Sequence, residues 1–581
     1  MTNYITSLTL RTSALRGLYA AILLCGLTAC GGGGSGSGQA TTPTPPITPV
    51  PPTVPVSVLK VSYPTLPVLV VGKAMADLLP TLENPDASST PSYSLASGSL
   101  PNGLALNSST GAIAGTPIQF AGFSVEVKAT SGSKTATASL TGNVTSPLGI
   151  ENVIAVPSVD AFRVTSPTAS YYVDSVKGSD NADGKTPTTP WQNLAKINAL
   201  TLQPGNVVNL ARGSVWNKQI KLKNAGTAAA PIVVQAYGSG EAPTIQLFTA
   251  DNDGTNGVLV TGSYIHVLEL RLSDIHWSAI HLDKSSHHVV VAGNEIFRSG
   301  MGVDLLGKHQ RALSNYIHDM TMVVDTGDAN TAWGANGIGF QGEDLEIAYN
   351  RFVNCRAQCK NFGGWDGGAI EYFGYEGSVG WNQITSDVRI HHNFLDMCDG
   401  FLEANGRIKG LVIAYNLFIN IPSGVFLFHM LTNTENGVAI KNTYEARMEN
   451  NTLIGAFTAF SFWNPNSYVT GGNSFVVRNN IAVTQSHVGW DLACAGTDLV
   501  HDHNLFNFLA GGSLGFSQHL WTLAGSEQVA APGFVDSDLK DYRLNATSVG
   551  LKGGYPTSFT ADLLGNRIPA NTAPDLGAYQ R

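Results

Sequence analysis

Charge is scarce in this chain and is not concentrated in any segment. Asp, Glu, Lys and Arg account for only 13% of its 581 residues, and the formal net charge is −9. The absence of a basic run argues against a nucleic-acid partner. An acidic polymer would need a local basic patch, because the net charge does not attract it. Glycine is abundant at 63 residues, and a hydrophobic content of 43% excludes wholesale disorder.

A hydrophobic run long enough to span a membrane is also missing. The apolar stretch at 17–27 is too short for a transmembrane helix, but it follows two arginines and precedes small residues, as a secretory signal does. Its end, LTAC at 27–30, resembles the lipobox of bacterial lipoproteins. The resemblance implies a signal peptide at 1–30, a lipid on Cys30, and attachment to the outer membrane of a Gram-negative bacterium on its surface or periplasmic side. A plain secretory signal with Cys30 as a bystander stays open.

An aliphatic alternation that runs into an asparagine recurs through the second half of the chain. The clearest copies are LEIAYNRF at 345–352, LVIAYNLF at 411–418 and FVVRNNIA at 475–482. With the other copies, the repeated residues are Asn294, Asn315, Asn350, Asn393, Asn416, Asn451 and Asn480. Irregular spacing with period-2 alternation is typical of a solenoid with variable loops. Asn suits the corner because it tolerates the left-handed conformation and forms hydrogen bonds from coil to coil, so we expect a parallel β-helix.

Few cysteines remain outside the expected signal, and no CxxC pair or His cluster accompanies them, which argues against a metal site. Cys355 and Cys398 each lie five residues after a repeated asparagine. They should therefore stack on adjacent coils, either as a disulfide or as two buried thiols.

The N-terminal half divides by composition. Residues 31–56 are rich in Gly and Ser, then Pro and Thr, which indicates a linker. Residues 57–145 contain short alternating runs separated by turn signals, and 146–168 are expected as a second linker. The segment LPNGLALNSSTGAIAGTP at 100–117, which lies within residues 57–145, resembles the immunoglobulin-like domain family of bacterial surface proteins. The resemblance implies a small β-sandwich that serves as a spacer or contacts carbohydrate.

The remaining residues, 169–581, are expected to form the solenoid and its closing segment. The phrases PGNVVNLARGSVW at 204–216 and APIVVQAYGSG at 230–240, with the ending at 541–581, resemble right-handed β-helix proteins of the pectate-lyase-like superfamily. The resemblance implies an all-β fold, a right-handed parallel β-helix behind an immunoglobulin-like β-sandwich. It also implies an extracellular polysaccharide as partner, but it does not choose a reaction, because one fold hosts many.

A second set of short strands precedes the asparagine phrases, such as AIHL at 279–282, AIEY at 369–372 and GVFL at 424–427. Coils stack about 4.8 Å apart, and alternate strand residues share a face. Aligned on the second residue of each strand, the third position forms one expected line: His281, Asp304, Gly339, Glu371, Glu403, Phe426 and Ser461. Gly339 should leave a gap in this line with room for a sugar.

The densest candidate chemistry lies in WDGGAIEYFG at 365–374 and MCDGFLEANGR at 397–407. Like charges opposed in a sheet are destabilising unless a proton or cation is shared, so Glu371 beside Glu403 indicates function. Carboxyls about 5 Å apart suit retaining glycoside hydrolysis, and about 6.5–9.5 Å suits inversion. Glu371 with Glu403 fits the first and Asp304 with Glu371 the second. We expect Glu371 to be the acid with a raised pKa, and Asp366 and Asp399 to be second carboxylates or orienting groups.

Two other interpretations stay open. Asp366, Glu371, Asp399 and Glu403 could bind Ca²⁺ in a uronate lyase whose base is Arg407, Lys409 or Lys441, although no lyase motif stands in the sequence. The line could also belong to a non-catalytic adhesin.

The preferred expectation is a monomeric, endo-acting glycoside hydrolase that requires no cofactor. Sugar rings stack on aromatic side chains, and polar groups orient them. The expected substrate-binding residues are His281, Trp333, Trp365, Tyr372, Arg407 and Lys441.

Overall fold

The structure is a computed structural model. It describes residues 58–70, 73–101, 103–117, 121–145, 154–247, 255–326, 332–374, 380, 382–463, 472–490, 498–509, 511–515 and 521–581. The expected signal peptide, Cys30 and the first linker lie outside the described residues. Within them, no helix is both long and apolar enough to cross a membrane.

The first described unit is a small β-sandwich. Its strands are β1 (Lys60–Ser62), β2 (Leu69–Val70), β3 (Met75–Leu78), β4 (Thr81–Glu83), β5 (Ser92–Ser97), β6 (Leu104–Leu106), β7 (Ile113–Gly115), β8 (Ala121–Ser131) and β9 (Lys134–Thr145). One sheet has the order β2-β9-β8-β5 and another the order β3-β7-β6. Alternate residues of β8, Val125, Val127 and Ala129, are buried in its core, so the period-2 pattern places one face of the strand inside.

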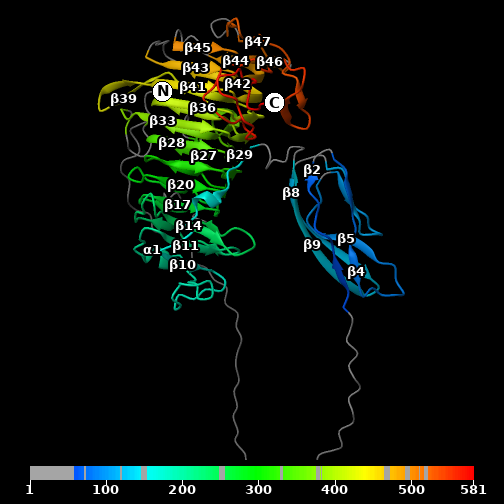
Figure 1. The fold of residues 1–581 in the computed structure, drawn as a ribbon. Helices are drawn as coiled ribbons and strands as arrows, with labels where there is room; N and C mark the ends of the chain where they lie inside the picture. Colours follow the sequence, from blue (N-terminus) through cyan, green and yellow to red (C-terminus); the bar gives the residue numbers. More distant parts are fainter. Residues whose placement is uncertain are drawn as a thin grey trace, which may run out of the picture. The chain divides into compact units, whose positions relative to one another are not determined.

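The second unit is a right-handed parallel β-helix, as predicted. Parallel strands stack into a tall solenoid, coloured from cyan through green and yellow to orange in Figure 1. Each coil contributes strands to three rows. The first row is β10 (Ala169–Val173), β11 (Asn206–Ala211), β14 (Ile232–Tyr237), β17 (Ile265–Leu268), β20 (Val289–Ala292), β23 (Arg311–Leu313), β28 (Glu343–Ala348), β33 (Thr385–His391), β36 (Arg407–Ala414), β41 (Thr443–Glu449), β43 (Ser474–Arg478) and β45 (Leu499–Asp502).

The other two rows belong to one continuous sheet. The second row is β12 (Val215–Trp216), β15 (Thr244–Gln246), β18 (Arg271–Ser273), β21 (Glu295–Phe297), β24 (Tyr316–His318), β29 (Arg351–Val353), β34 (Phe394–Asp396), β37 (Leu417–Ile419), β46 (Leu505–Phe508) and β47 (Gln528–Val529). The third row is β13 (Ile220–Leu222), β16 (Val258–Val260), β19 (Ser278–Leu282), β22 (Met301–Leu305), β27 (Asn336–Phe340), β32 (Gly368–Phe373), β35 (Leu402–Asn405) and β38 (Gly424–His429). The long strands β42 (Thr452–Trp463) and β44 (Ile481–Trp490) run through both rows.

The predicted asparagine ladder is confirmed at the corner between the first and second rows. Nδ2 of Asn294 donates to Oδ1 of Asn315 at 3.0 Å and to the carbonyl oxygen of Val267 at 3.1 Å. The same two contacts recur at Asn315, Asn350, Asn393, Asn416, Asn451 and Asn480. All these asparagines are buried, so the ladder satisfies polar groups that would otherwise be costly to bury.

One detail of the predicted corner is wrong. The left-handed residue is the one that precedes the ladder asparagine, as at Tyr349 (φ 59°), His392 (φ 55°) and Tyr415 (φ 54°). The ladder asparagines do not have positive φ. Their side chains must extend along the solenoid to reach the next coil, and the preceding residue makes the turn instead.

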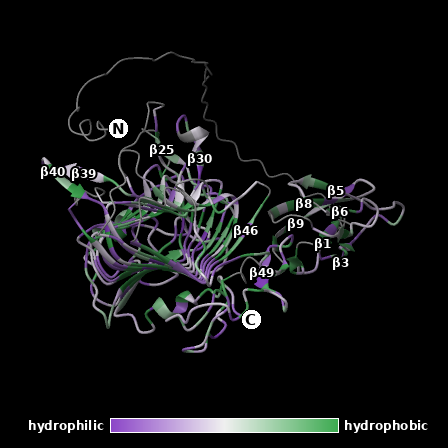
Figure 2. Cartoon of the chain, turned by 90° about the horizontal axis from the view of Figure 1, so that it is seen from above, coloured by the Kyte–Doolittle hydropathy of each residue, from purple (hydrophilic) through white to green (hydrophobic). Residues whose placement is uncertain are grey.

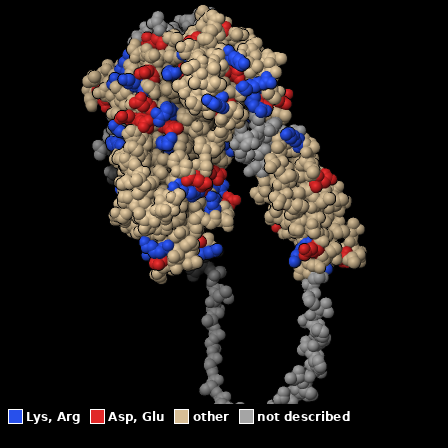
Figure 3. All heavy atoms as spheres, in the orientation of Figure 1, with Lys and Arg blue, Asp and Glu red and all other residues tan. Residues whose placement is uncertain are grey.

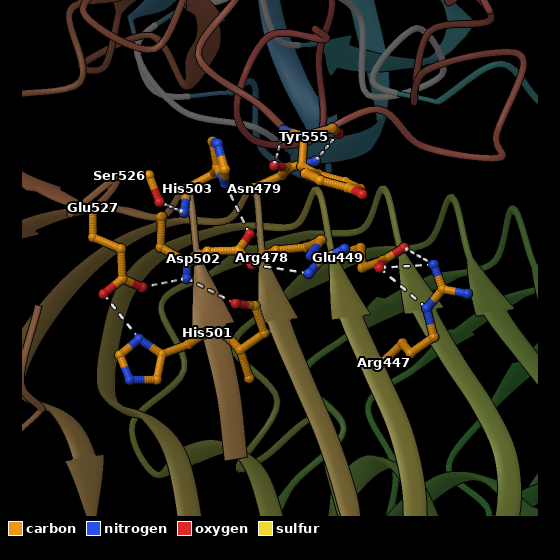
Figure 4. A network of polar contacts seen from close by, with 12 residues as sticks. Arg447, Glu449, Arg478, Asn479, His501, Asp502, His503, Ser526, Glu527 and Tyr555 are labelled. Atoms are coloured by element: carbon orange, nitrogen blue, oxygen red, sulfur yellow. Dashed lines mark hydrogen bonds and ion pairs between the residues drawn. The ribbon is translucent and has the colours of Figure 1, made fainter. Parts of the chain in front are cut away.

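Charged and polar side chains near the C-terminal ends of the last first-row strands also pair with one another. Figure 4 shows His501 pointing toward Glu527, with Nδ1 and Oε2 2.9 Å apart, while Arg478 pairs with Asp502 at 2.9 Å and Arg447 with Glu449.

In the orientation of Figure 3, acidic and basic side chains are interspersed on a surface that is mostly uncharged. This agrees with the low charge content of the sequence.

Short segments cover the solenoid at its start and along its side. Helix α1 (Ala195–Ala199) buries Ile197 in the solenoid core. Residues 154–168, expected as part of a linker, contain a 3₁₀ helix at Val159–Phe162 and contact the first row, where Phe162 accepts a hydrogen bond from Nδ1 of His266 at 2.7 Å. The closing segment, with β48 (Phe534–Asp536) and β49 (Asp541–Leu544), buries Tyr542 and Tyr579 beside Leu417.

The candidate disulfide is wrong. Cys355 and Cys398 are free thiols buried in the core, and Cys359 is also free. Burial raises the pKa of Cys355, and Cys398 beside it acts in the same direction. The two thiols lie in the loops that follow β29 and β34 and are buried side by side in the core, whereas a disulfide needs Cβ atoms directed at each other.

Candidate active site on the third strand row

Most of the predicted line of side chains is present in the third row. His281 is in register with Asp304, Asp304 with Gly339, Gly339 with Glu371, and Glu371 with Glu403. The predicted line breaks at β38, where Glu403 is in register with Leu427 and Leu402 with Phe426. Phe426 is buried in the core, and Ser461 returns to the line opposite Leu427. The adjacent hydrophobic residues Val425 and Phe426 are both buried, so hydrophobic alternation does not fix the register of β38.

The expected gap at Gly339 is filled by a neighbour. A Cβ atom at Gly339 would lie 3.1 Å from Oδ1 of Asp304. Asp304 is itself buried, accepts a hydrogen bond from Ser278, and lies 2.8 Å from Nδ1 of His281. Burial opposes protonation of His281, but the hydrogen bond and charge of Asp304 raise the pKa of His281 overall. Asp304 and His281 therefore contact each other at one end of the line.

The two glutamates differ in their surroundings. Glu371 is buried at 8% exposure and accepts a hydrogen bond from Nδ2 of Asn336. Glu403 has a side chain that is 42% exposed, and its Oε1 lies 2.7 Å from Nε2 of His429. Nδ1 of His429 is buried and has no hydrogen-bond partner among the described residues. The sequence analysis missed His429, although it lies two positions after Leu427 and so shares its face.

Asp366 and Asp399, which precede these two glutamates in the chain, have raised pKa values. Burial raises the pKa of Asp366 to about 7, and the negative charges of Glu403 and Asp399 add to the effect. Burial also raises the pKa of Asp399 to about 6, with Glu403 adding to the increase and Arg356 opposing it. These two raised pKa values belong to residues that the sequence analysis expected to have a supporting role. The raised pKa expected for Glu371 stays a prediction.

Hairpins that interrupt the coils border the third row. Asp366 lies on the hairpin of β30 (Ala357–Gln358) and β31 (Trp365–Asp366). The preceding coil carries the hairpin of β25 (Met322–Asp325) and β26 (Ala332–Gly334), and the other border carries β39 (Thr432–Glu435) with β40 (Val438–Lys441). Figure 2 shows these hairpins projecting from the coil cross-section. The line of carboxylates therefore lies on a face with insertions on both sides.

The predicted substrate-binding residues have different environments. Trp333 packs on Trp277 with ring centroids 5.0 Å apart, and Trp365 is exposed at 38%. Lys441 lies at the end of β40. The guanidinium of Arg356, which the sequence analysis missed, lies over the Trp365 ring at 4.4 Å.

Tyr372 is not a surface residue, so its predicted binding role is wrong. It is buried at 1% exposure, and its hydroxyl donates to the carbonyl oxygen of Arg407 at 2.8 Å. It follows Glu371 in the strand and therefore points to the opposite, core face. Arg407 donates from Nη1 to Oδ1 of Asn382 at 3.0 Å.

The alternative Ca²⁺ site lacks a suitable arrangement of ligands. Across the described part of the chain, no group of three or more His, Cys, Asp or Glu side chains is placed to hold a metal ion. Asp366, Glu371, Asp399 and Glu403 are all described, so the absence includes them.

Comparisons with known proteins concern the two units separately. Residues 40–145 match the family model of a putative Ig domain, which agrees with the immunoglobulin-like unit. No curated protein sequence matches the chain.

Several solved structures of carbohydrate enzymes resemble the chain. A GH136 lacto-N-biosidase from Eubacterium ramulus is 17% identical, with 62% of this chain and 68% of that chain covered and a TM-score of 0.36. An alginate lyase from Paenibacillus sp. str. FPU-7 is 16% identical, with coverages of 55% and 92% and a TM-score of 0.34. A family 28 exopolygalacturonase from Yersinia enterocolitica is 12% identical, with coverages of 81% and 99% and a TM-score of 0.32. At such low identities and TM-scores they support no statement about the reaction of this chain.

Proposed function

We propose that the protein hydrolyses glycosidic bonds in an extracellular polysaccharide at the third strand row. The observation that carries the proposal is a group of carboxyls in two different environments on neighbouring coils of the third row. Asp366 and Asp399 have pKa values of about 7 and about 6, while Glu403 is hydrogen-bonded to His429 and open to solvent. Glycoside hydrolysis needs one protonated carboxylic acid and one ionised carboxylate on either side of the bond.

The roles follow from these environments. Asp366, which has the higher pKa, donates its proton to the departing glycosidic oxygen as the bond between that oxygen and the anomeric carbon breaks. Glu403 attacks the anomeric carbon or removes a proton from the water that attacks it. His429 holds the Glu403 carboxylate in place, and Asp399 is the second candidate for the acid.

The test uses the chain without its expected signal peptide, residues 31–581, on neutral and uronic-acid polysaccharides. New reducing ends and the ultraviolet absorbance of unsaturated uronates are followed together, with and without a chelator. Reducing ends alone, unaffected by chelator, support the proposal. Absorbance that rises with the reducing ends overturns it in favour of a lyase, and absence of cleavage across the panel overturns it in favour of an adhesin.

Variants assign the roles. Glu403→Gln and Asp366→Asn should each reduce kcat about 10²- to 10⁴-fold, the usual range for a lost acid or base. The matched control is Glu343→Gln, a partly exposed residue of the first row paired with Lys308, which should leave kcat unchanged. Wild-type turnover by Glu403→Gln would contradict the role of Glu403 as nucleophile or base.

We further propose that this enzyme is held at the outer membrane by a lipid on Cys30, a placement that rests on the sequence at 27–30. Cys30→Ala should then move the protein from the membrane fraction to the soluble fraction of expressing cells. Retention of the variant in the membrane fraction contradicts the lipid anchor.

A further inference from the structure

Three glycines occupy equivalent positions on three successive coils of the third row; Gly400 and Gly424 are partly exposed, and Gly368 is buried. Gly368 begins β32, Gly400 precedes β35 and Gly424 begins β38. Their stacking is direct: the nearest atom to a Cβ on Gly368 would be the carbonyl oxygen of Gly400 at 3.6 Å, and that to a Cβ on Gly400 the carbonyl oxygen of Gly424 at 3.1 Å. We call these three residues the glycine lane.

At Gly368 and Gly424 neither the backbone conformation nor the space around a Cβ requires glycine, whereas a Cβ on Gly400 would be a tight contact. None of the three has a positive φ, and a Cβ on Gly424 would meet no atom closer than Oγ of Ser461 at 3.4 Å. Gly302 and Gly337, in the same row, are different, because a Cβ there would lie 2.3 Å and 2.5 Å from a backbone oxygen. Glycine weakens a strand when its conformational freedom is not needed.

Glycine inside a strand also marks places where a ligand approaches the backbone closely. The lane begins beside Asn336, which is in register with Gly368, and ends at Thr458, which is in register with Gly424. Side chains at both ends therefore limit the bare backbone to a short stretch along the solenoid.

The lane separates the two kinds of carboxyl. Along the chain, Asp366 comes just before Gly368 and Glu371 just after it, and Asp399 and Glu403 flank Gly400 in the same way. The acids with raised pKa therefore border one edge of the lane, and the glutamates border the other.

We propose that the glycine lane is the subsite for the sugar ring next to the cleaved bond, and that this ring is uncharged. The proposal rests on the proposed hydrolase function and adds its substrate class. Bare backbone lets the flat face of a pyranose ring lie close enough for carboxyls on both edges to reach its glycosidic bond. The flanking Glu371 and Glu403 carboxylates would repel a uronate at the same place.

Affinity gel electrophoresis of residues 31–581 tests the lane without requiring turnover. The probes are galactomannan, glucomannan and mixed-linkage β-glucan as neutral polymers, with alginate and polygalacturonate as uronate polymers. At least one neutral polymer should retard the wild-type chain, and neither uronate polymer should. Gly424→Ala and Gly424→Val should weaken the apparent affinity at least tenfold. Retardation by a uronate polymer, or by none of the five probes, overturns the proposal.

Two controls separate a filled lane from a damaged fold. Gly525→Ala adds a Cβ at a turn with no atom within 4 Å and should bind like wild type. The thermal unfolding midpoint of Gly424→Ala should be no lower than that of the wild type, because the site has room for a Cβ. Wild-type affinity in both Gly424 variants overturns the proposal.

Glu403→Gln separates the two proposals. A variant that binds a neutral polymer but no longer cleaves it supports both. If Glu403→Gln cleaves at the wild-type rate while the Gly424 variants lose binding, the assigned hydrolytic mechanism fails and the lane stands as a binding site.

Discussion

The amide of Asn504 donates to Oε1 of Glu527 at 2.6 Å, and this contact ends the asparagine ladder. Every earlier asparagine donates to the next one, so the last amide needs an acceptor of another kind. Glu527 also receives hydrogen bonds from Nε1 of Trp521 at 3.1 Å and from the backbone N–H of Ala524 at 2.9 Å, while Nδ1 of His501 lies 2.9 Å from Oε2. A fully buried carboxylate thus closes the C-terminal end of the ladder.

Glu527→Gln should destabilise the solenoid by about 1–3 kcal/mol, because one acceptor oxygen is replaced by a donor facing other donors. Burial raises the pKa of Glu527, but hydrogen bonds from His501 and Asn504 outweigh it and lower the value overall. Its charge therefore contributes stability above the ordinary glutamate pKa, and this is lost as pH falls through the lowered folded value.

Urea unfolding at pH 7 and pH 3 checks this prediction. The difference between wild type and Glu527→Gln should be larger at pH 7 than at pH 3. Glu445→Gln, an exposed residue of β41, is the control. Equal differences at both pH values would contradict the role assigned to the charge.

Acid should loosen the contact between the closing segment and the solenoid at His392. Its Nε2 lies 3.1 Å from the carbonyl oxygen of Ala561, and its Nδ1 lies 2.8 Å from Nδ1 of His391. Burial, together with the charge of His391, lowers the pKa of His392 from 6.5 to about 4. The unfolded chain therefore binds this proton first, and the folded state loses up to about 3 kcal/mol as pH falls from about 6.5 to about 4.

The free energy of unfolding from urea titrations between pH 7 and pH 4 measures this loss. His392→Gln should reduce the slope of stability against pH over that range, even if the variant is less stable at pH 7. A slope identical to that of the wild type would show that His392 is not the responsible group.

The pH profile of activity should report the raised pKa values of Asp366 and Asp399. A general acid must be protonated, so kcat/KM should fall on the alkaline side with an apparent pKa near 7 if Asp366 is the donor. The fall should come near pH 6 if Asp399 is the donor. If the alkaline fall in kcat/KM comes near pH 7, Asp366→Asn should remove it. If the fall comes near pH 6, Asp399→Asn should remove it. A profile flat from pH 5 to pH 9 would exclude both residues as acids.

Reductant should leave the stability of the solenoid unchanged. Cys355 and Cys398 are buried free thiols, so no bond between them is available to cut. The thermal unfolding midpoint should be equal with and without dithiothreitol. A midpoint that falls with dithiothreitol in the wild type but not in Cys398→Ala would restore the disulfide.

The sequence alone was sufficient for the repeat. Period-2 alternation, the recurring asparagines and the third-row strands predicted the solenoid, the ladder and the register from His281 to Glu403, all of which are confirmed. These features depend on the residues of one strand and on equivalent positions in the next coil. Such relations are periodic, and a periodic relation is visible in the sequence.

The tertiary structure decided what repeats do not encode. The register of β38 was not fixed by the sequence because Val425 and Phe426 are both buried in the core. The side chain of Asp304 lies close to Gly339. The raised pKa values of Asp366 and Asp399 arise from burial beside a hairpin and from the charge of Glu403. His429 reaches Glu403 across neighbouring coils. Packing, burial and diagonal contacts depend on the whole environment of a side chain, and therefore only the folded chain determines them.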